Sequence, residues 1–224
     1  MKLHGLLAAG LLALAPLFPA SAAVITYDAI LNGASEAPPN ASPGTGAALI
    51  TIDDVLNTMR VQVEFSGLTA VVTTSHIHCC TAVAESGTAG VATVTPTFPG
   101  FPSGVTSGVY DHSFDLLALT SYRPAFVAAN GGTAATAAAA LLGGFGASVF
   151  GGDSTAYLNI HTTAFPGGEI RGFIRRCEEP SGIVTKMQNP CESIASVPEP
   201  SAIALIALAT LVIVSFGFGR LKEI

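Results

Sequence analysis

The sequence contains no tryptophan, and only 11% of its 224 residues are charged, nine of them basic and fifteen acidic. So few basic residues leave no electrostatic footprint for nucleic acid, which excludes nucleic acid as a partner. Intrinsic disorder is excluded as well, because half of the residues are hydrophobic. The sequence also lacks a phosphate-binding loop and a Gly-x-Ser-x-Gly nucleophile elbow. No complete catalytic constellation is recognisable, which favours a protein that is not an enzyme.

Glycine and proline, in contrast, are abundant, with 24 and 14 copies, and this is typical of many short elements joined by turns. Alternation of apolar and polar residues with a period of two predicts strands at 25–31, 59–66, 156–161 and 169–175. Such strands bury one face and expose the other, as in an antiparallel sheet. The run Pro166-Gly167-Gly168 predicts a hairpin turn between the last two strands.

Two short helices are expected at 121–130 and 133–142. Each segment begins at a serine or threonine that can cap a helix and ends before a pair of glycines. With the strands, they predict a mainly β fold within 24–176, an antiparallel Greek-key-like β-sandwich with one or two short helices.

The first 23 residues have the features of a secretory signal peptide. They contain one lysine, an apolar core from Leu6 to Phe18, and small residues before a cleavage site after Ala22 or Ala23. We therefore expect an exported protein that starts near residue 24.

The segment 201–219 carries no charge and, as a helix, would be about 28 Å long, enough to cross a bilayer once. Arg220 and Lys222, in the tail 220–224, would stay in the cytoplasm by the positive-inside rule. A C-terminal transmembrane helix that anchors the protein to the inner membrane, at least transiently, is therefore predicted. The proline-rich segment 177–200 before it is expected to be an extended linker.

This linker ends in Pro198-Glu199-Pro200, followed by the apolar segment and the basic tail. The arrangement resembles the PEP-CTERM sorting signal of Gram-negative bacteria. The resemblance implies recognition by an exosortase and delivery to the cell surface or extracellular matrix, where extracellular polysaccharide or other surface proteins are possible partners. A plain C-terminal anchor is the alternative.

Several motifs in the middle of the chain carry a second resemblance. They are Leu31-Asn32-Gly33, Glu36-Ala37-Pro38-Pro39, Ser75-His76-Ile77-His78, Tyr157-Leu158-Asn159-Ile160-His161-Thr162 and Gly167-Gly168-Glu169-Ile170-Arg171-Gly172. In this order they resemble the CHRD domain, over residues 24–176. The resemblance implies an exported module and little about its activity.

Three histidines are candidate metal ligands. His76 and His78 stand two apart in a predicted strand, so both project from the face opposite Ile77. His161 lies in another strand, facing away from that strand's apolar row. On these outward faces the three histidine side chains can come together at one place. Three neutral imidazoles are suitable ligands for copper or zinc. Glu36 and Glu169 could add carboxylate ligands.

The His-x-His motif is also similar to the copper-binding strand of the copper/zinc superoxide dismutases. This resemblance implies His76 and His78 as copper ligands, with His161 as a third, while His112 is the only spare histidine. The alternative is structural, with these histidines hydrogen-bonding to each other, to Glu169 and to Arg171.

The cysteines number four, which favours disulfides in an exported protein. Adjacent cysteines lie only ~3.8 Å apart at Cα across a trans peptide, so a ring between Cys79 and Cys80 would be strained. One or both are expected to reach Cys177 and Cys191, although the pairing stays open. Thiolate ligation of a metal beside His78 is the alternative.

Two functions therefore remain open. The first is a non-catalytic interaction or structural role at the cell surface. The second is extracellular binding of copper or zinc by His76, His78 and His161.

Overall fold

A computed structural model of the chain describes residues 24–148 and 151–177. The expected signal peptide (1–23), the linker from 178 with Cys191 and Pro198-Glu199-Pro200, the apolar segment 201–219 and the tail 220–224 lie outside these residues. Within the described part, no helix is both long and apolar enough to cross a membrane.

Antiparallel strands form one sheet in the order β4-β6-β7-β1-β2-β3-β5, with β8 pairing to β1. Their bounds are β1 (Val24–Asn32), β2 (Thr45–Asp53), β3 (Thr58–Ser66), β4 (Val72–His78), β5 (Gly108–Asp115), β6 (Tyr157–Thr162), β7 (Ile170–Phe173) and β8 (Arg175–Arg176).

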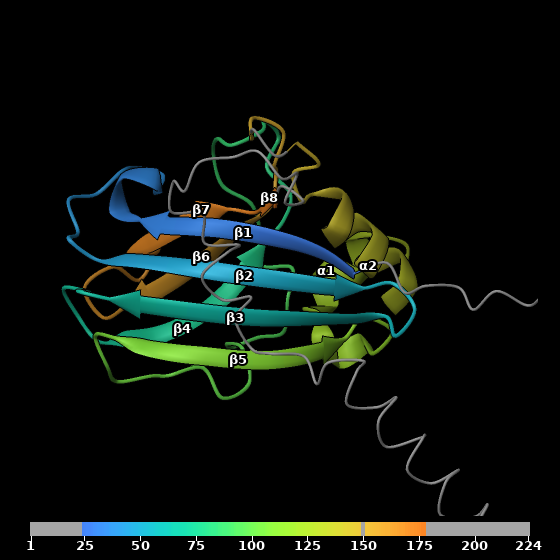
Figure 1. The fold of residues 1–224 in the computed structure, drawn as a ribbon, viewed down its shortest axis with the longest axis horizontal. Coiled ribbons are helices and arrows are strands. Elements are labelled where there is room, and N and C mark those ends of the chain that lie inside the picture. Colours follow the sequence, from blue (N-terminus) through green and yellow to red (C-terminus); the bar gives the residue numbers. More distant parts are fainter. Residues whose placement is uncertain (1–23, 149–150, 178–224) are drawn as a thin grey trace, which may run out of the picture.

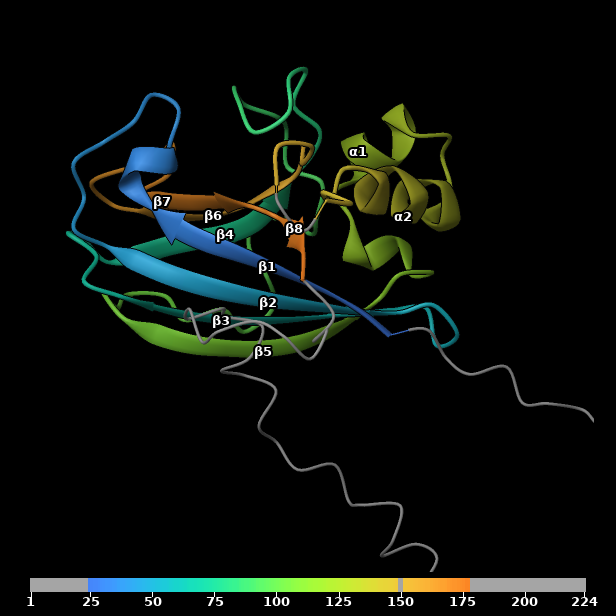
Figure 2. The same ribbon diagram turned by 45° about the horizontal axis from the view of Figure 1, so that its top comes forward.

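Strand β1 joins the two halves of this sheet. One edge of β1 pairs with β2 along its whole length, and the other edge pairs with β7 and β8. The sheet curls so that β4, β6 and β7 lie across β1, β2, β3 and β5 (Figure 1, Figure 2). The expected sandwich of two separate sheets is therefore corrected to a single curled sheet, because β1 is hydrogen-bonded on both edges.

The core lies inside this curl. Strand β3 alternates as expected, with Met59, Val61, Val63 and Phe65 buried. From the opposite half, β6 contributes Leu158 and Ile160, both fully buried. The period-two alternation thus correctly identified the core faces of these strands.

The helices gather at one end of the sheet (Figure 2). They are α1 (Pro124–Ala129) and α2 (Ala134–Gly143), and the 3-10 turn η2 (Leu119–Ser121) precedes α1. The other 3-10 turn, η1 (Gly33–Ser35), follows β1 at the opposite end of the sheet. Thr133 caps α2 as expected and forms a capping box with Thr136. The first helix starts later than expected, at Pro124, because Ser121 closes η2 and donates its hydroxyl to the Asp115 carbonyl.

The hairpin between β6 and β7 turns where the sequence predicts it. Gly168 donates its amide to the Phe165 carbonyl, and Ile160 pairs with Ile170 beyond the turn. Gly168 has a φ of 131°, a backbone conformation that favours glycine. This turn sets Asn159 of β6 directly opposite Arg171 of β7.

Candidate metal centre

Pairing between β4 and β6 brings the three histidines to one place. His76 lies opposite Asn159, His78 opposite Tyr157, and His161 opposite Thr74. Cross-strand partners share a face of the sheet, so all three imidazoles stand on the side away from the core. Ile77, between two of them, points into the core and is fully buried.

The three rings form a compact cluster. One nitrogen from each of His76, His78 and His161 can be chosen so that all three atoms lie within 4.8 Å of one another. The ring centroids are 5.4 Å apart for His76 and His161, and 5.8 Å apart for each of the other two pairs. Imidazole nitrogen binds zinc at a Zn–N distance of ~2.0–2.1 Å, so binding one ion would draw the three rings inward.

The outward side of the strands is not open to water, contrary to what the sequence pattern predicts. The exposed fractions of His76, His78 and His161 are only 6%, 8% and 9%. The chain between β4 and β5 and the β6–β7 hairpin fold over them and supply backbone hydrogen-bond acceptors. This cover was not visible in the sequence, because it depends on loops that have no periodic pattern.

One nitrogen of each ring forms a hydrogen bond to a backbone carbonyl of these loops. A carbonyl oxygen only accepts hydrogen bonds, so the ring nitrogen facing it carries the proton. The three pairs are His76 Nε2 with the Pro96 carbonyl, His78 Nδ1 with the Ala89 carbonyl at 2.9 Å, and His161 Nδ1 with the Pro166 carbonyl at 2.9 Å.

The other nitrogen of each ring has no partner. His76 Nδ1, His78 Nε2 and His161 Nε2 are buried and make no hydrogen bond to any described residue. Because the opposite nitrogen of each neutral ring holds the proton, each of these atoms presents a lone pair. Three buried lone pairs without a donor are costly unless a cation or water satisfies them.

The electrostatics of the cluster keep the rings neutral. Burial lowers the pKa of His78 to about 4, against the opposing effect of its bond to the Ala89 carbonyl. Burial likewise lowers the pKa of His76 and of His161. Neutral imidazole is the form that binds a metal, and its second nitrogen typically donates to a backbone carbonyl or carboxylate, as here.

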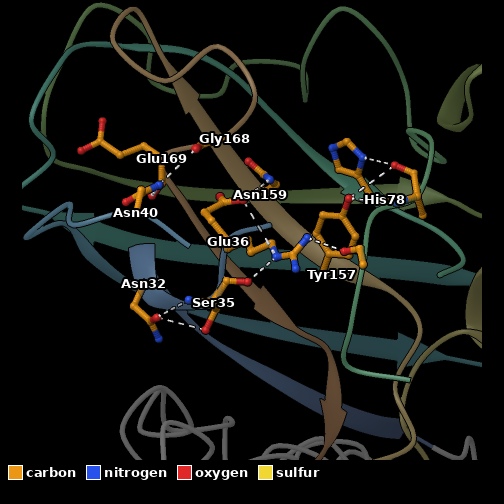
Figure 3. Close-up of polar contacts among 12 residues, drawn as sticks. Asn32, Ser35, Glu36, Asn40, His78, Tyr157, Asn159, Gly168 and Glu169 are labelled. Atoms are coloured by element: carbon orange, nitrogen blue, oxygen red, sulfur yellow. Dashed lines mark hydrogen bonds and ion pairs between the residues drawn. The ribbon is translucent and has the colours of Figure 1, made fainter. Parts of the chain in front are cut away.

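A column of stacked groups supports one side of the cluster. Tyr157 stacks on His78, and the Arg171 guanidinium lies 4.5 Å from the Tyr157 ring centre. Arg171 also donates to the carbonyls of Ser35 and Gly87. Figure 3 shows Tyr157 and His78 on this side of the cluster. The supporting roles of Tyr157 and Arg171 escaped the sequence analysis, although Tyr157 shares a strand face with His161.

The remaining candidate ligands lie outside the cluster. Glu169 is fully buried, but its carboxylate already accepts hydrogen bonds from Ser42, Thr69 and Thr162. His112 is on β5, at the opposite edge of the sheet from β4. Among the described residues, the group of possible metal ligands consists of the three histidines alone.

The cysteines pair differently from the expectation. Cys79 and Cys80 form a disulfide with each other, so neither reaches Cys177 or Cys191. Their Cα atoms are 3.0 Å apart, closer than the trans spacing on which the expectation was based. Both sulfurs lie near the Ala140 carbonyl of α2, at 3.8 and 3.7 Å, and neither belongs to the histidine cluster. Cys177 is also disulfide-bonded, whereas Cys191 lies outside the described residues.

Comparison with known proteins identifies the domain. The model of the CHRD-domain family matches residues 27–174, well over half of the chain. The chain belongs to the CHRD-domain family. The CHRD match contains His76, His78 and His161 and all of β2 to β7. No curated protein and no solved structure matches the chain. The resemblance to the CHRD domain is thus confirmed, whereas the PEP-CTERM signal stays a prediction.

Proposed function

We infer that this CHRD-domain protein binds one copper or zinc ion through His76, His78 and His161. The observation that carries this conclusion is the set of three buried ring nitrogens without a partner, one from each histidine. A purely structural role needs each ring nitrogen to be satisfied by the protein or by ordered water. Here each ring is satisfied on one side only, and all the unsatisfied sides belong to one cluster.

The donor set favours copper or zinc over other ions. Imidazole nitrogen suits both metals, whereas magnesium and calcium prefer oxygen ligands. Three protein ligands leave a fourth position open for water or a substrate, as in catalytic zinc sites. A metal bound in this way could take part in catalysis at its fourth position. The fold is equally compatible with binding alone.

The setting that fits this function is extracellular. The signal-peptide features of residues 1–23 and membership of the CHRD family support export. The PEP-CTERM-like end supports an exosortase as partner and transient anchoring in the inner membrane by the segment 201–219. At the cell surface or in the matrix, extracellular polysaccharide or other surface proteins are the expected neighbours.

Metal analysis tests the function. Untagged full-length protein is stripped with a chelator, incubated separately with Zn²⁺ or Cu²⁺, passed through gel filtration, and analysed by plasma mass spectrometry. We expect one ion per chain in the wild type and in His112→Ala, and none in His76→Ala or His161→Ala. An empty wild-type protein would leave a metal-free interaction or structural role. Retention of the ion by both cluster variants would show that the metal is bound outside the three histidines.

A further inference from the structure

The disulfide between Cys79 and Cys80 differs from the cross-links that stabilise most exported proteins, because it joins residues that are adjacent in the chain. A cross-link lowers the entropy of the unfolded chain by closing a loop, and the effect grows with the length of that loop. No residue lies between these two cysteines, so the bond adds almost nothing of this kind to stability. This favours a local role for the bond over a role in holding distant parts of the fold together.

The two cysteines differ in their access to solvent. Cys79 is 6% exposed, whereas Cys80 is an exposed residue. Thiol–disulfide exchange begins when a thiolate attacks one sulfur of the disulfide, so access decides which sulfur is attacked. Exposed disulfides are also more easily reduced than protected ones, and regulatory disulfides belong to the exposed class. Cys80 Sγ is therefore the point of attack, and Cys79 Sγ is the leaving group.

The disulfide packs against the backbone at the end of α2. A Cβ built on Gly144 would lie 2.5 Å from Cys79 Sγ and 2.7 Å from Cys80 Sγ. When the bond breaks, the sulfurs must separate from ~2.05 Å to the ~3.5–4.0 Å of nonbonded heavy atoms. They cannot separate toward Gly144, because both already lie close to it. Cleavage therefore displaces the cysteines relative to α2.

On the β4 side, this displacement reaches the histidine cluster directly. Cys79 follows His78, and the segment 89–91 holds both residues. The Ala89 carbonyl accepts a hydrogen bond from His78 Nδ1 at 2.9 Å, and the Gly90 carbonyl accepts one from the Cys79 amide at 3.1 Å. A shift of Cys79 therefore disturbs the segment that fixes the orientation of the His78 ring.

On the β6 side, the connection runs through Gly144. Its carbonyl accepts hydrogen bonds from the amides of Thr155 and Ala156, both at 2.9 Å. Ala156 directly precedes Tyr157, whose ring stacks on His78. The backbone contacts of the disulfide and of Gly144 thus lead to both members of the stack between His78 and Tyr157.

We propose that the Cys79–Cys80 disulfide is a reversible redox switch of the histidine centre, which a dithiol reductant opens and which binds metal more weakly when open. The inference rests on the proposed metal site. A thiolate of the dithiol attacks Cys80 Sγ, the bond between the two cysteine sulfurs breaks, and Cys79 leaves as a thiolate.

The second thiol of the reductant then attacks the mixed disulfide and releases Cys80. Two electrons and two protons pass from the dithiol, which becomes a disulfide, to the two cysteines, which become thiols. Exchange with a disulfide oxidant reverses the reaction. The closed form is the resting state in an oxidising compartment.

Glutathione disulfide tests the point of attack. Folded full-length Cys79→Ser and Cys80→Ser each keep one thiol at this site, and intact-protein mass spectrometry follows the glutathione adduct. We expect Cys79→Ser, which keeps the exposed Cys80, to form the adduct about 10-fold faster than Cys80→Ser. Equal rates overturn the proposed exchange at Cys80. If Cys79→Ser does not fold, Cys79→Ala replaces it.

Zinc affinity tests the switch itself. Full-length wild type is reduced with a water-soluble phosphine, freed of it by gel filtration without oxygen, and mapped by alkylation to show that Cys79 and Cys80 carry thiols. Competition with a chromophoric chelator gives the Kd for zinc. We expect this Kd to rise about 10-fold on reduction and to return after reoxidation with glutathione disulfide.

The matched control is the double variant Cys79→Ala/Cys80→Ala. It keeps Cys177, which is also disulfide-bonded, so it separates reduction at Cys177 from reduction at the switch. Treatment with the phosphine should leave its Kd for zinc unchanged. An equal rise in this variant assigns the effect to Cys177 and overturns the proposal.

The other outcomes separate the switch from the metal site. An unchanged Kd in the reduced wild type overturns the switch and leaves the metal site intact. Tighter binding after reduction also overturns it, because the thiols are then metal ligands. A Cys79–Cys80 bond that is reduced only after unfolding in urea overturns it as well. Failure of the oxidised wild type to bind zinc contradicts the metal site itself.

Discussion

The imidazole of His78 lies flat against the ring of Tyr157, with centroids 4.8 Å apart and 6° between the planes. Both groups also bind the same backbone carbonyl, that of Ala89, His78 through Nδ1 at 2.9 Å and Tyr157 through its hydroxyl at 3.4 Å. The stack and the shared acceptor together fix the plane and the tautomer of His78. Its ring, with Nε2 buried and without a partner among the described residues, is thereby held beside His76 and His161.

Removing the Tyr157 ring should weaken metal binding. In Tyr157→Leu the stack is lost and His78 gains rotational freedom, so the Kd for zinc should rise about 10- to 100-fold. Tyr157→Phe keeps the stack and loses only the hydroxyl, so a smaller rise is expected. Competition with a chromophoric chelator measures both values.

Tyr110→Phe is the matched control, because Tyr110 is a buried tyrosine on β5 whose hydroxyl has no hydrogen-bond partner among the described residues. It should bind zinc like the wild type. Unchanged affinity in Tyr157→Leu would show that the stack does not orient His78.

The metal-free protein should lose stability in mild acid because of His78. The pKa of this residue is lowered from 6.5 to about 4 on folding, so the unfolded state binds more protons between these values. The contribution of neutral His78 to the free energy of unfolding is therefore complete above pH 6.5 and decreases as the pH falls toward 4. Between pH 7 and pH 5 it should fall by about 2 kcal/mol.

Urea unfolding of chelator-treated wild type and His78→Gln at both pH values measures this effect. The variant, which has no imidazole to protonate, should lose correspondingly less stability on acidification. Equal losses in the two proteins would contradict the pKa shift of His78.

Gly168→Ala should destabilise the fold, whereas Gly167→Ala in the same turn should not. A Cβ at Gly168 would lie 2.5 Å from Asn159 Nδ2 and 2.6 Å from Glu36 Oε1, and the φ of 131° is itself unfavourable for alanine. A Cβ at Gly167 meets nothing within 4 Å. We expect a loss of about 1–3 kcal/mol for the first variant, measured by urea unfolding. Similar free energies for the two variants would contradict this crowding.

The sequence by itself determined the local features of this protein. Alternation along β3 and β6 identified their core faces, because the side chains of a strand point alternately to its two sides. The Pro166-Gly167-Gly168 run identified the hairpin, and Thr133 identified the start of α2, since turns and caps depend on adjacent residues. The spacing of His76 and His78 likewise put both imidazoles on one strand face.

Only the tertiary structure decided which distant strands and loops those strand faces contact. Strand β4 pairs with β6, about half of the domain later in the chain, and this long-range pairing sets His161 and Asn159 beside His76. Loops without any periodicity bury the cluster and supply the carbonyls that leave one nitrogen of each ring free. A repeating pattern of residues records the direction of side chains along one strand, but not which distant strand or loop folds over them. The candidate ligands were therefore visible in the sequence, whereas their burial and their unpaired nitrogens were not.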